Sequence, residues 1–411
     1  MRYFVESYGC TMNFGEGRRL SADMASLGYA EAPSAVDADI VILNTCTVVE
    51  STEKRMLSRI SELKKAGKEV IVTGCMAKAQ PQRIDIRLPG SLMVVPSDYH
   101  MFARLVGERY GIAGPPLPVM ADITSILPIA QGCRGRCSYC ITKIARGELV
   151  SYPQEDLLDT FRSFVSSGAR EILLTAQDTA SYGMDTGSGL PELVSRALET
   201  DGDYRIRIGM MNPDSLSRCW EGLVETFDDR RMYRFLHIPV QSGSDTVLAA
   251  MRRKYTVGQF MELVDDIRSA SPDVSIATDM ICGFPGETDE DHEASMDLIR
   301  RLRADTINIT RFSPRPGTAA WDMPQVHGRI ANERSKAMTE LKNETEMDVN
   351  SAMVGKEYLA LCTEHGKDGM IVRTGNYRPV VVREDIALGD FVTVRVTENR
   401  PTYLMGELSQ K

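Results

Sequence analysis

Three cysteines within eight residues constrain this chain more than any other feature of its 411-residue sequence. Cys133, Cys137 and Cys140, here called the loop trio, have the spacing C-x3-C-x2-C and follow an apolar segment that predicts a strand. Spacings of two and three residues let one loop surround an iron–sulfur cluster. Three ligands leave one iron of a four-iron cluster open, and an open coordination site is typical of catalytic metal. The alternative is a zinc-binding turn whose fourth ligand lies elsewhere.

A second set of cysteines is spread over the first 75 residues. Cys10, Cys46 and Cys75, here called the strand-end trio, each follow a predicted strand. The carboxyl ends of neighbouring parallel strands share one edge of a sheet, so three thiols there can converge on one cluster. Gly9 and Gly74 permit the tight turns that this approach needs. The alternative is three buried small apolar residues, as free cysteines often are.

Strand and helix patterns divide the chain into three parts. Residues 1 to about 112 alternate strands with helices and predict a small parallel sheet, and residues 113–118 form a linker rich in glycine and proline. Further strand–helix units from about 121 to 327 predict an open or partial barrel. After a polar helix, the tail predicts a small β-barrel. Strands are expected over residues 3–5, 40–43, 70–72, 92–95, 126–130, 171–175, 205–209, 235–239, 274–278, 306–310, 358–361, 370–373, 380–382 and 391–396.

The composition excludes several classes of protein. With 43% hydrophobic and 26% charged residues, the chain is not largely disordered. No apolar run approaches the roughly 18 residues of a membrane helix and none resembles a signal peptide, so we expect a cytoplasmic protein without a membrane partner. Nine cysteines, an odd number, favour metal or redox chemistry over a disulfide framework. A net charge of −9 argues against bulk binding of nucleic acid but not against a local basic site.

The residues of the loop trio resemble the radical S-adenosylmethionine superfamily. Its signature is this triplet with an aromatic residue, here Tyr139, before the last cysteine. The resemblance implies that S-adenosylmethionine binds the open iron, and that one electron then yields a 5′-deoxyadenosyl radical. It makes the three cysteines of the loop trio the catalytic residues. The protein then positions the cofactor and excludes water.

Motifs along the whole chain are similar to those of the methylthiotransferase family. Tyr-Gly-Cys-Thr-Met-Asn, Leu-Asn-Thr-Cys-Thr-Val and Thr-Gly-Cys-Met-Ala precede the triplet in that order. The resemblance implies a flavodoxin-like methylthiotransferase domain over residues 1–112, a partial (β/α)6 radical domain over 121–349, and a TRAM RNA-binding β-barrel over 350–411. It also implies two 4Fe–4S clusters, of which the strand-end trio holds the one that handles the inserted sulfur.

Polar residues at the ends of the barrel strands are candidates for cofactor binding. Gln177, Gln241, Ser242 and Arg315 lie in segments such as Pro-Val-Gln-Ser-Gly-Ser and Ser-Pro-Arg-Pro-Gly-Thr, which resemble family motifs. Polar groups there, together with Tyr139, can contact the adenosine and methionine parts of the cofactor. The alternative for any single residue is ordinary turn chemistry. Arg315 is also a candidate for an RNA phosphate.

Basic residues beside the loop trio and in the tail are candidates for RNA binding. Lys143 and Arg146 follow the triplet, and Arg373, Tyr377 and Arg378 lie in a segment similar to a TRAM domain. Cations beside an aromatic ring suit phosphates and base stacking. From charge alone, a solvated β-surface is an equal alternative. Lys143 and Arg146 are also hypothetical partners for a carboxylate of the substrate.

The segment after the triplet favours one branch of the methylthiotransferases. Ile-Thr-Lys-Ile-Ala-Arg-Gly resembles the archaeal and eukaryotic branch, which acts on N6-threonylcarbamoyladenosine at position 37 of tRNA. We therefore expect conversion of this nucleoside to its 2-methylthio derivative, with tRNA, an electron donor and a sulfur source as partners. Alternatives of the same fold act on isopentenyladenosine in tRNA or on an aspartate of a ribosomal protein. An alternative of another class is a non-catalytic iron–sulfur protein that binds RNA or transfers electrons.

Overall fold

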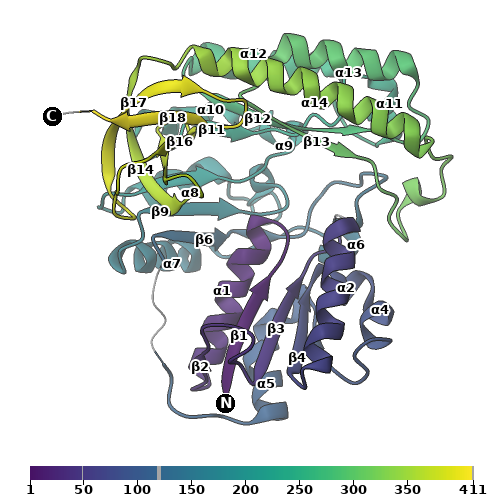
Figure 1. The fold of residues 1–411 in the computed structure, drawn as a ribbon, viewed down its shortest axis with the longest axis vertical. Helices are drawn as coiled ribbons and strands as arrows, with labels where there is room; N and C mark the ends of the chain where they lie inside the picture. Colours follow the sequence, from purple (N-terminus) through teal and green to yellow (C-terminus); the bar gives the residue numbers. More distant parts are fainter. Residues whose placement is uncertain (49, 118–121, 410–411) are drawn as a thin grey trace.

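A computed structural model describes residues 1–48, 50–117 and 122–409 of the chain, in three α/β or all-β parts that follow one another (Figure 1). The expected linker residue Pro118 and the expected domain bounds at residues 121 and 411 lie outside the described residues. Within these ranges, no helix has both the length and the apolar character needed to cross a bilayer.

The first part is one parallel sheet with helices on both faces. Its strand order is β2-β1-β3-β4-β5, with β1 at Arg2–Ser7, β2 at Ala30–Glu31, β3 at Ile40–Thr45, β4 at Glu69–Gly74 and β5 at Leu92–Val94. This is the flavodoxin-like order, in which ligands bind at the carboxyl ends of the strands beside β1 and β3. Helices α1 (Thr11–Ser26) and α5 (Phe102–Tyr110) pack on one face, and α2 (Glu50–Lys65) packs on the other.

The second part is a partial barrel of six parallel strands, as predicted. One sheet has the order β10-β9-β6 and the other the order β11-β12-β13. Isolated bridges from Ile206 to Met232 and from Met210 to His237 join the two sheets. The strands are β6 (Thr124–Pro128), β9 (Glu171–Thr175), β10 (Arg205–Ile208), β11 (Phe235–His237), β12 (Ser275–Cys282) and β13 (Thr306–Arg311).

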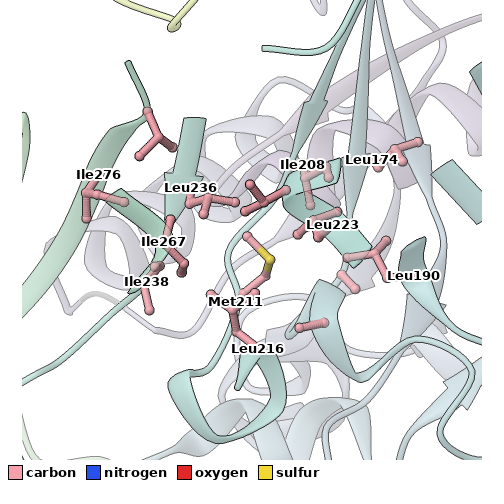
Figure 2. Close-up of a cluster of buried hydrophobic side chains, with 14 of the residues drawn as sticks. Leu174, Leu190, Ile208, Met211, Leu216, Leu223, Leu236, Ile238, Ile267 and Ile276 are labelled. Atoms are coloured by element: carbon pink, nitrogen blue, oxygen red, sulfur yellow. The ribbon is translucent and has the colours of Figure 1, made fainter. Parts of the chain in front are cut away.

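The main apolar core lies between these strands and their covering helices. Figure 2 shows a part of it in which buried side chains of β9, β10, β11 and β12 meet side chains of the surrounding helices, among them Leu174, Ile208, Leu236, Ile276, Leu190, Leu223 and Ile267. The polar segments that follow the strands lie beyond this core, at the C-terminal edge of the barrel. That edge is where barrel enzymes place their chemistry.

Helix α14 (Gly328–Ser351) leads into the third part, a closed barrel of five strands with the order β14-β15-β16-β18-β17. Four of these strands match predicted ones. They are β14 (Glu357–His365), β15 (Met370–Thr374), β16 (Pro379–Val382) and β17 (Phe391–Asn399). The fifth, β18 (Leu404–Leu408), was not predicted, because its five residues include glycine and glutamate, which are depleted in strands.

Candidate functional site

The loop trio lies at the C-terminal edge of the partial barrel, beyond β6. The sulfurs of Cys133 and Cys137 face one small volume, because a Cβ placed on Gly135 would lie 3.2 Å from the first and 3.8 Å from the second. The Gly135 amide also donates to Cys133 Sγ at 3.2 Å. The Cys140 amide donates to the Cys137 carbonyl at 3.2 Å, and Cys140 directly precedes helix α6 (Ile141–Arg146). The loop thus turns the thiols of Cys133 and Cys137 toward a space that glycine leaves open.

Neighbouring elements fix this loop in position. The side-chain oxygen of Gln177 accepts a hydrogen bond from the Gly132 amide at 2.6 Å. Ser138, inside the loop, donates its hydroxyl to the Ala250 carbonyl at 2.8 Å and its amide to the Met251 carbonyl at 3.1 Å. Gln177, predicted as a cofactor contact, therefore holds the loop that carries the trio.

Lys143 is also used within the loop region. Its ammonium donates to the Cys133 carbonyl and pairs with Glu148 at 2.6 Å. This ammonium holds the pKa of the Glu148 carboxyl below its ordinary value. The predicted contact of Lys143 with RNA or a substrate carboxylate would compete with these two partners.

Tyr139 is held by an arginine that the sequence did not single out. Arg253 donates to the Tyr139 hydroxyl at 2.6 Å and to Asn212 Oδ1 at 2.8 Å. The Tyr139 ring packs edge-on against Phe284, with 6.2 Å between ring centroids. Burial raises the pKa of the Cys137 thiol, and the charge of Arg253 opposes that rise. Arg253 was missed because its segment, Met-Arg-Arg-Lys-Tyr, lies far from the triplet in sequence and carries no motif.

The strand-end trio follows three adjacent strands of the first sheet, as predicted. Cys10 comes after β1, Cys46 after β3 and Cys75 after β4. The parallel register pairs Thr45 with Gly74, which sets the ends of β3 and β4 side by side. Cys46 and Cys75 are buried, and Cys10 is exposed.

Two glycines allow this close approach. Gly9 has a φ of +107°, and a Cβ there would lie 2.9 Å from Cys46 Sγ. Gly74 has a φ of +85°, and a Cβ there would overlap the Thr45 carbonyl oxygen. Both are backbone conformations that L side chains rarely adopt. The prediction that Gly9 and Gly74 permit tight turns and a close approach of the backbone is therefore confirmed.

Asn13 ties the cysteine-bearing loops together. Its Nδ2 donates to the Tyr8 carbonyl at 2.7 Å and to the Thr45 carbonyl at 3.0 Å. It thereby joins the segment before Cys10 to the segment before Cys46. Asn13 ends the motif Tyr-Gly-Cys-Thr-Met-Asn, so its place three residues after the cysteine was a signal that the sequence offered.

Burial favours the neutral form of one thiol in each trio, Cys133 and Cys75. It raises the pKa of Cys133 to about 12 and that of Cys75 to about 11. A metal that binds these thiols must therefore displace their protons.

Arg146 lies inside the interface between the first two parts, with only 1% of its side chain exposed. Its guanidinium pairs with Glu16, donates to Asn13 Oδ1 at 2.7 Å, and donates from Nε to Cys75 Sγ at 3.2 Å. The carboxylate that Arg146 binds in this structure belongs to Glu16 of the same chain. Its contact with RNA or a substrate carboxylate stays a prediction, and it would require Arg146 to leave these buried partners.

Arg315 lies in the same interface and is also buried. It donates to Glu53 at 3.1 Å and from Nη2 to the Val48 carbonyl at 2.8 Å. Partners from the first part of the chain take these donors, so a contact with the cofactor or an RNA phosphate would compete with them and stays a prediction.

Two of the three predicted RNA contacts in the C-terminal barrel pack against the partial barrel. Arg378 is buried and donates to the Asp305 carbonyl at 2.5 Å. The Tyr377 ring lies 4.8 Å from that of Tyr233 and has Arg373 stacked 4.7 Å from its centre. The side chains of Tyr377 and Arg378 are thus used in the domain interface, and their direct contact with RNA stays a prediction. Arg373 is partly exposed and pairs with Glu364 at 2.8 Å.

Gln241 and Ser242 follow β11 at the same edge of the barrel as the loop trio. Gln241 has a φ of +74° and bridges to Met280 through its backbone. Ser242 is buried, and its hydroxyl accepts from the Ser244 amide at 3.2 Å. Their predicted contact with the cofactor stays a prediction.

The donor chemistry of both trios fits iron–sulfur clusters. Among the described residues, no three His, Cys, Asp or Glu side chains converge closely enough to bind a single metal ion. The thiolates of a four-iron cluster bind different iron atoms, so they need not converge on one point. All-thiol ligand sets are the ones that such clusters use, and the volume beside Gly135 would be filled by any side chain there.

Family models match all three parts of the chain. Residues 2–95 match Uncharacterized protein family UPF0004, residues 127–299 match the Radical SAM superfamily, and residues 351–409 match the TRAM domain.

Relatives of known name match over nearly the full length. The probable threonylcarbamoyladenosine tRNA methylthiotransferase of Pyrococcus abyssi is 36% identical, with 99% of each chain covered. That of Archaeoglobus fulgidus is 37% identical over 100% of this chain and 99% of its own. The threonylcarbamoyladenosine tRNA methylthiotransferase of Drosophila pseudoobscura is 35% identical over 99% of this chain and 77% of its own.

Solved structures share the fold at low identity. The radical S-adenosylmethionine methyltransferase TsrM from Kitasatospora setae has a TM-score of 0.59 and 15% identity, over 78% of this chain and 77% of its own. The cobalamin-dependent radical enzyme OxsB has a TM-score of 0.52 and 12% identity, over 82% of this chain and 56% of its own.

Proposed function

The chain belongs to the threonylcarbamoyladenosine tRNA methylthiotransferase family, and from this premise we propose that it converts N6-threonylcarbamoyladenosine at position 37 of tRNA to its 2-methylthio derivative. The observation that carries the proposal is the presence of two thiol trios, one in each of two domains that pack against each other. A single radical site would suffice to remove hydrogen, whereas insertion of sulfur needs a second site to deliver it.

The two trios are proposed to hold one 4Fe–4S cluster each, with S-adenosylmethionine at the open iron of the loop trio. When bound, these groups supply the radical that removes the C2 hydrogen of the adenine, together with the sulfur and methyl group that replace it. The catalytic residues on this proposal are Cys133, Cys137 and Cys140, with Cys10, Cys46 and Cys75 as the second ligand set.

The residues around the loop trio keep the reacting centre in one geometry. Gln177 and Ser138 fix the loop through the hydrogen bonds described above, and Arg253 orients Tyr139. A loop held in this way needs little rearrangement to bind its cofactor. Such preorganisation lowers the free-energy cost of reaching the reactive geometry. The buried ring of Phe284 packs edge-on against Tyr139 and adds an apolar contact on that side.

The proposed partners are tRNA, an electron donor and a sulfur source, and the proposed location is the cytoplasm. The target base lies in the anticodon loop, where single-stranded bases can be turned outward without opening a duplex. The proposed domains are residues 1–112, 121–349 and 350–411. The third resembles an RNA-binding barrel, in which the guanidinium of Arg373 is partly exposed.

The test is mass spectrometry of tRNA nucleosides from a strain that lacks the gene. We expect the 2-methylthio derivative of threonylcarbamoyladenosine to disappear and its precursor to accumulate. The wild-type gene should restore it, and a Cys137→Ala gene should not. An unchanged level of this nucleoside in the deletion strain would overturn the substrate. If the purified, reconstituted and reduced protein fails to cleave S-adenosylmethionine, the non-catalytic alternative is favoured.

A further inference from the structure

The site of the strand-end trio is completed by a residue of the radical domain. Helix α6 begins directly after Cys140 of the loop trio and ends at Arg146. From there the Arg146 side chain crosses the domain interface and donates from Nε to Cys75 Sγ at 3.2 Å. Helix α3 (Cys75–Ala79), which begins at this cysteine, packs against α6. One short helix therefore links a ligand of one trio to the sulfur of the other.

The remaining donors of Arg146 are fixed by residues of α1. Nη2 donates to Glu16 Oε2 at 2.7 Å and to Asn13 Oδ1 at 2.7 Å, and Nη1 pairs with the other oxygen of Glu16. This two-pronged geometry leaves Nε aimed at the sulfur, as the planar fork of arginine allows. Arg146 and Glu16 are both buried, so water does not screen their charges.

A second arginine of the radical domain holds the loop of Cys46. Arg315 donates from Nη2 to the Val48 carbonyl at 2.8 Å, and the Val48 amide lies 3.5 Å from Cys46 Sγ. This contact acts through the backbone of the Cys46 loop. Arg146, in contrast, donates directly to a sulfur of the strand-end trio.

We propose that Arg146 is a positioning residue that raises the reduction potential of the cluster held by the strand-end trio. One-electron reduction adds a negative charge to such a cluster, and hydrogen bonds and charges at its sulfurs set its potential. A buried guanidinium bonded to Cys75 stabilises the reduced form. Glu16, which is paired with Arg146, opposes that effect. The inference rests on the proposed function, because it takes Cys10, Cys46 and Cys75 as cluster ligands.

The test uses the full chain with all three cysteines of the loop trio replaced by alanine, so that a single cluster is observed. After anaerobic reconstitution with iron and sulfide, its midpoint potential is measured by titration with dithionite and electron paramagnetic resonance. In this background, Arg146→Gln should make reduction about tenfold less favourable, equal to a fall of about 59 mV for one electron. In Arg146→Lys, which keeps the positive charge but lacks the planar guanidinium, the midpoint potential should fall less.

Glu16→Gln gives the sharper comparison, because it removes the opposing charge and leaves the arginine. It should raise the potential, whereas a purely structural role of the pair would shift neither variant or both in the same direction. Arg378→Gln is the matched control. It removes a buried arginine from the other domain interface and should leave the potential unchanged.

Each outcome separates this inference from the proposed function. If the parent variant takes up no cluster, the proposed function fails. If it takes up a cluster and neither Arg146→Gln nor Glu16→Gln changes the midpoint potential from that of the parent, the proposed function stands and the role of Arg146 is overturned. If Arg146→Gln does not retain iron, the sign of the shift in Glu16→Gln decides.

Discussion

The two cysteine trios are built by opposite means. The loop trio lies within eight residues, so one loop and its neighbours determine its geometry. The strand-end trio comes from three strands, and the register of the sheet, the side chain of Asn13 and an arginine of another domain hold it. A site of the first kind depends on local backbone, whereas one of the second kind depends on the assembly of two domains. The strand-end trio should therefore be the more sensitive to changes outside its ligands.

The largest expected effect separates the two trios by their chemistry. Cys137→Ala should abolish cleavage of S-adenosylmethionine, because the cofactor then has no cluster. Cys46→Ala should keep cleavage and abolish formation of the methylthio product. Both are measured by liquid chromatography of 5′-deoxyadenosine and of tRNA nucleosides. Cys219→Ala, which replaces a partly buried cysteine outside both trios, is the control. Equal loss of cleavage in both variants would break the distinction between the trios.

The glycines test how tightly the strand-end trio is packed. Gly9→Ala places a Cβ 2.9 Å from Cys46 Sγ at a φ of +107°. Strain of this kind costs about 1–3 kcal/mol, and relieving it moves the sulfur. We expect about half of the iron to be lost, measured per chain after reconstitution. Gly67→Ala is the control, because Gly67 also has a positive φ, of +68°, but no neighbour within 4 Å. It introduces backbone strain without a contact to a cysteine and should keep its iron. Retention of full iron by Gly9→Ala would show that the site tolerates displacement.

A pair of amide side chains compares how the two trios are supported. Asn13→Ala removes two bonds between cysteine loops and one to Arg146. Gln177→Ala removes a single bond to the Gly132 amide, which costs about 1–3 kcal/mol if that group stays unsatisfied. Iron content should fall in the first variant and hold in the second, with slower cleavage of S-adenosylmethionine in the second. The reverse order of iron loss would contradict the account of non-local support.

The smallest expected effect concerns α1, which begins beside Cys10 and carries Asn13 and Glu16. Burial raises the pKa of Asp23 on this helix to about 6. Because the folded chain binds this proton more tightly than the unfolded chain, ionising Asp23 costs stability. The cost appears as pH rises from about 4 to 6 and is complete above that window. Asp23→Asn should therefore raise the Tm of the protein without clusters more at pH 7.5 than at pH 5. An equal gain in Tm at both pH values would contradict this account of Asp23.

The fold and the ligand sets were accessible from sequence because they follow from local patterns. Apolar runs predicted the six strands of the partial barrel, and the position of each cysteine after a strand placed both trios at sheet edges. Parallel strands share their carboxyl edge whatever the helices between them, so this inference needs no tertiary detail.

The roles of the arginines were not accessible, since charge alone does not indicate burial. Arg146 meets Glu16, which lies 130 residues away in sequence, only after two domains pack together. Arg378 likewise finds Asp305 across an interface. Before such partners are known, an arginine near a cluster motif or in an RNA-binding domain is naturally assigned to phosphate.

The central claim, that two separate clusters are held by two trios, is tested most directly by counting iron in three proteins reconstituted in parallel. The wild type should bind about eight iron atoms per chain, and each variant with one trio replaced by alanine should bind about four. Wild-type protein that binds about four, and loses none when Cys10, Cys46 and Cys75 are replaced, would contradict the claim.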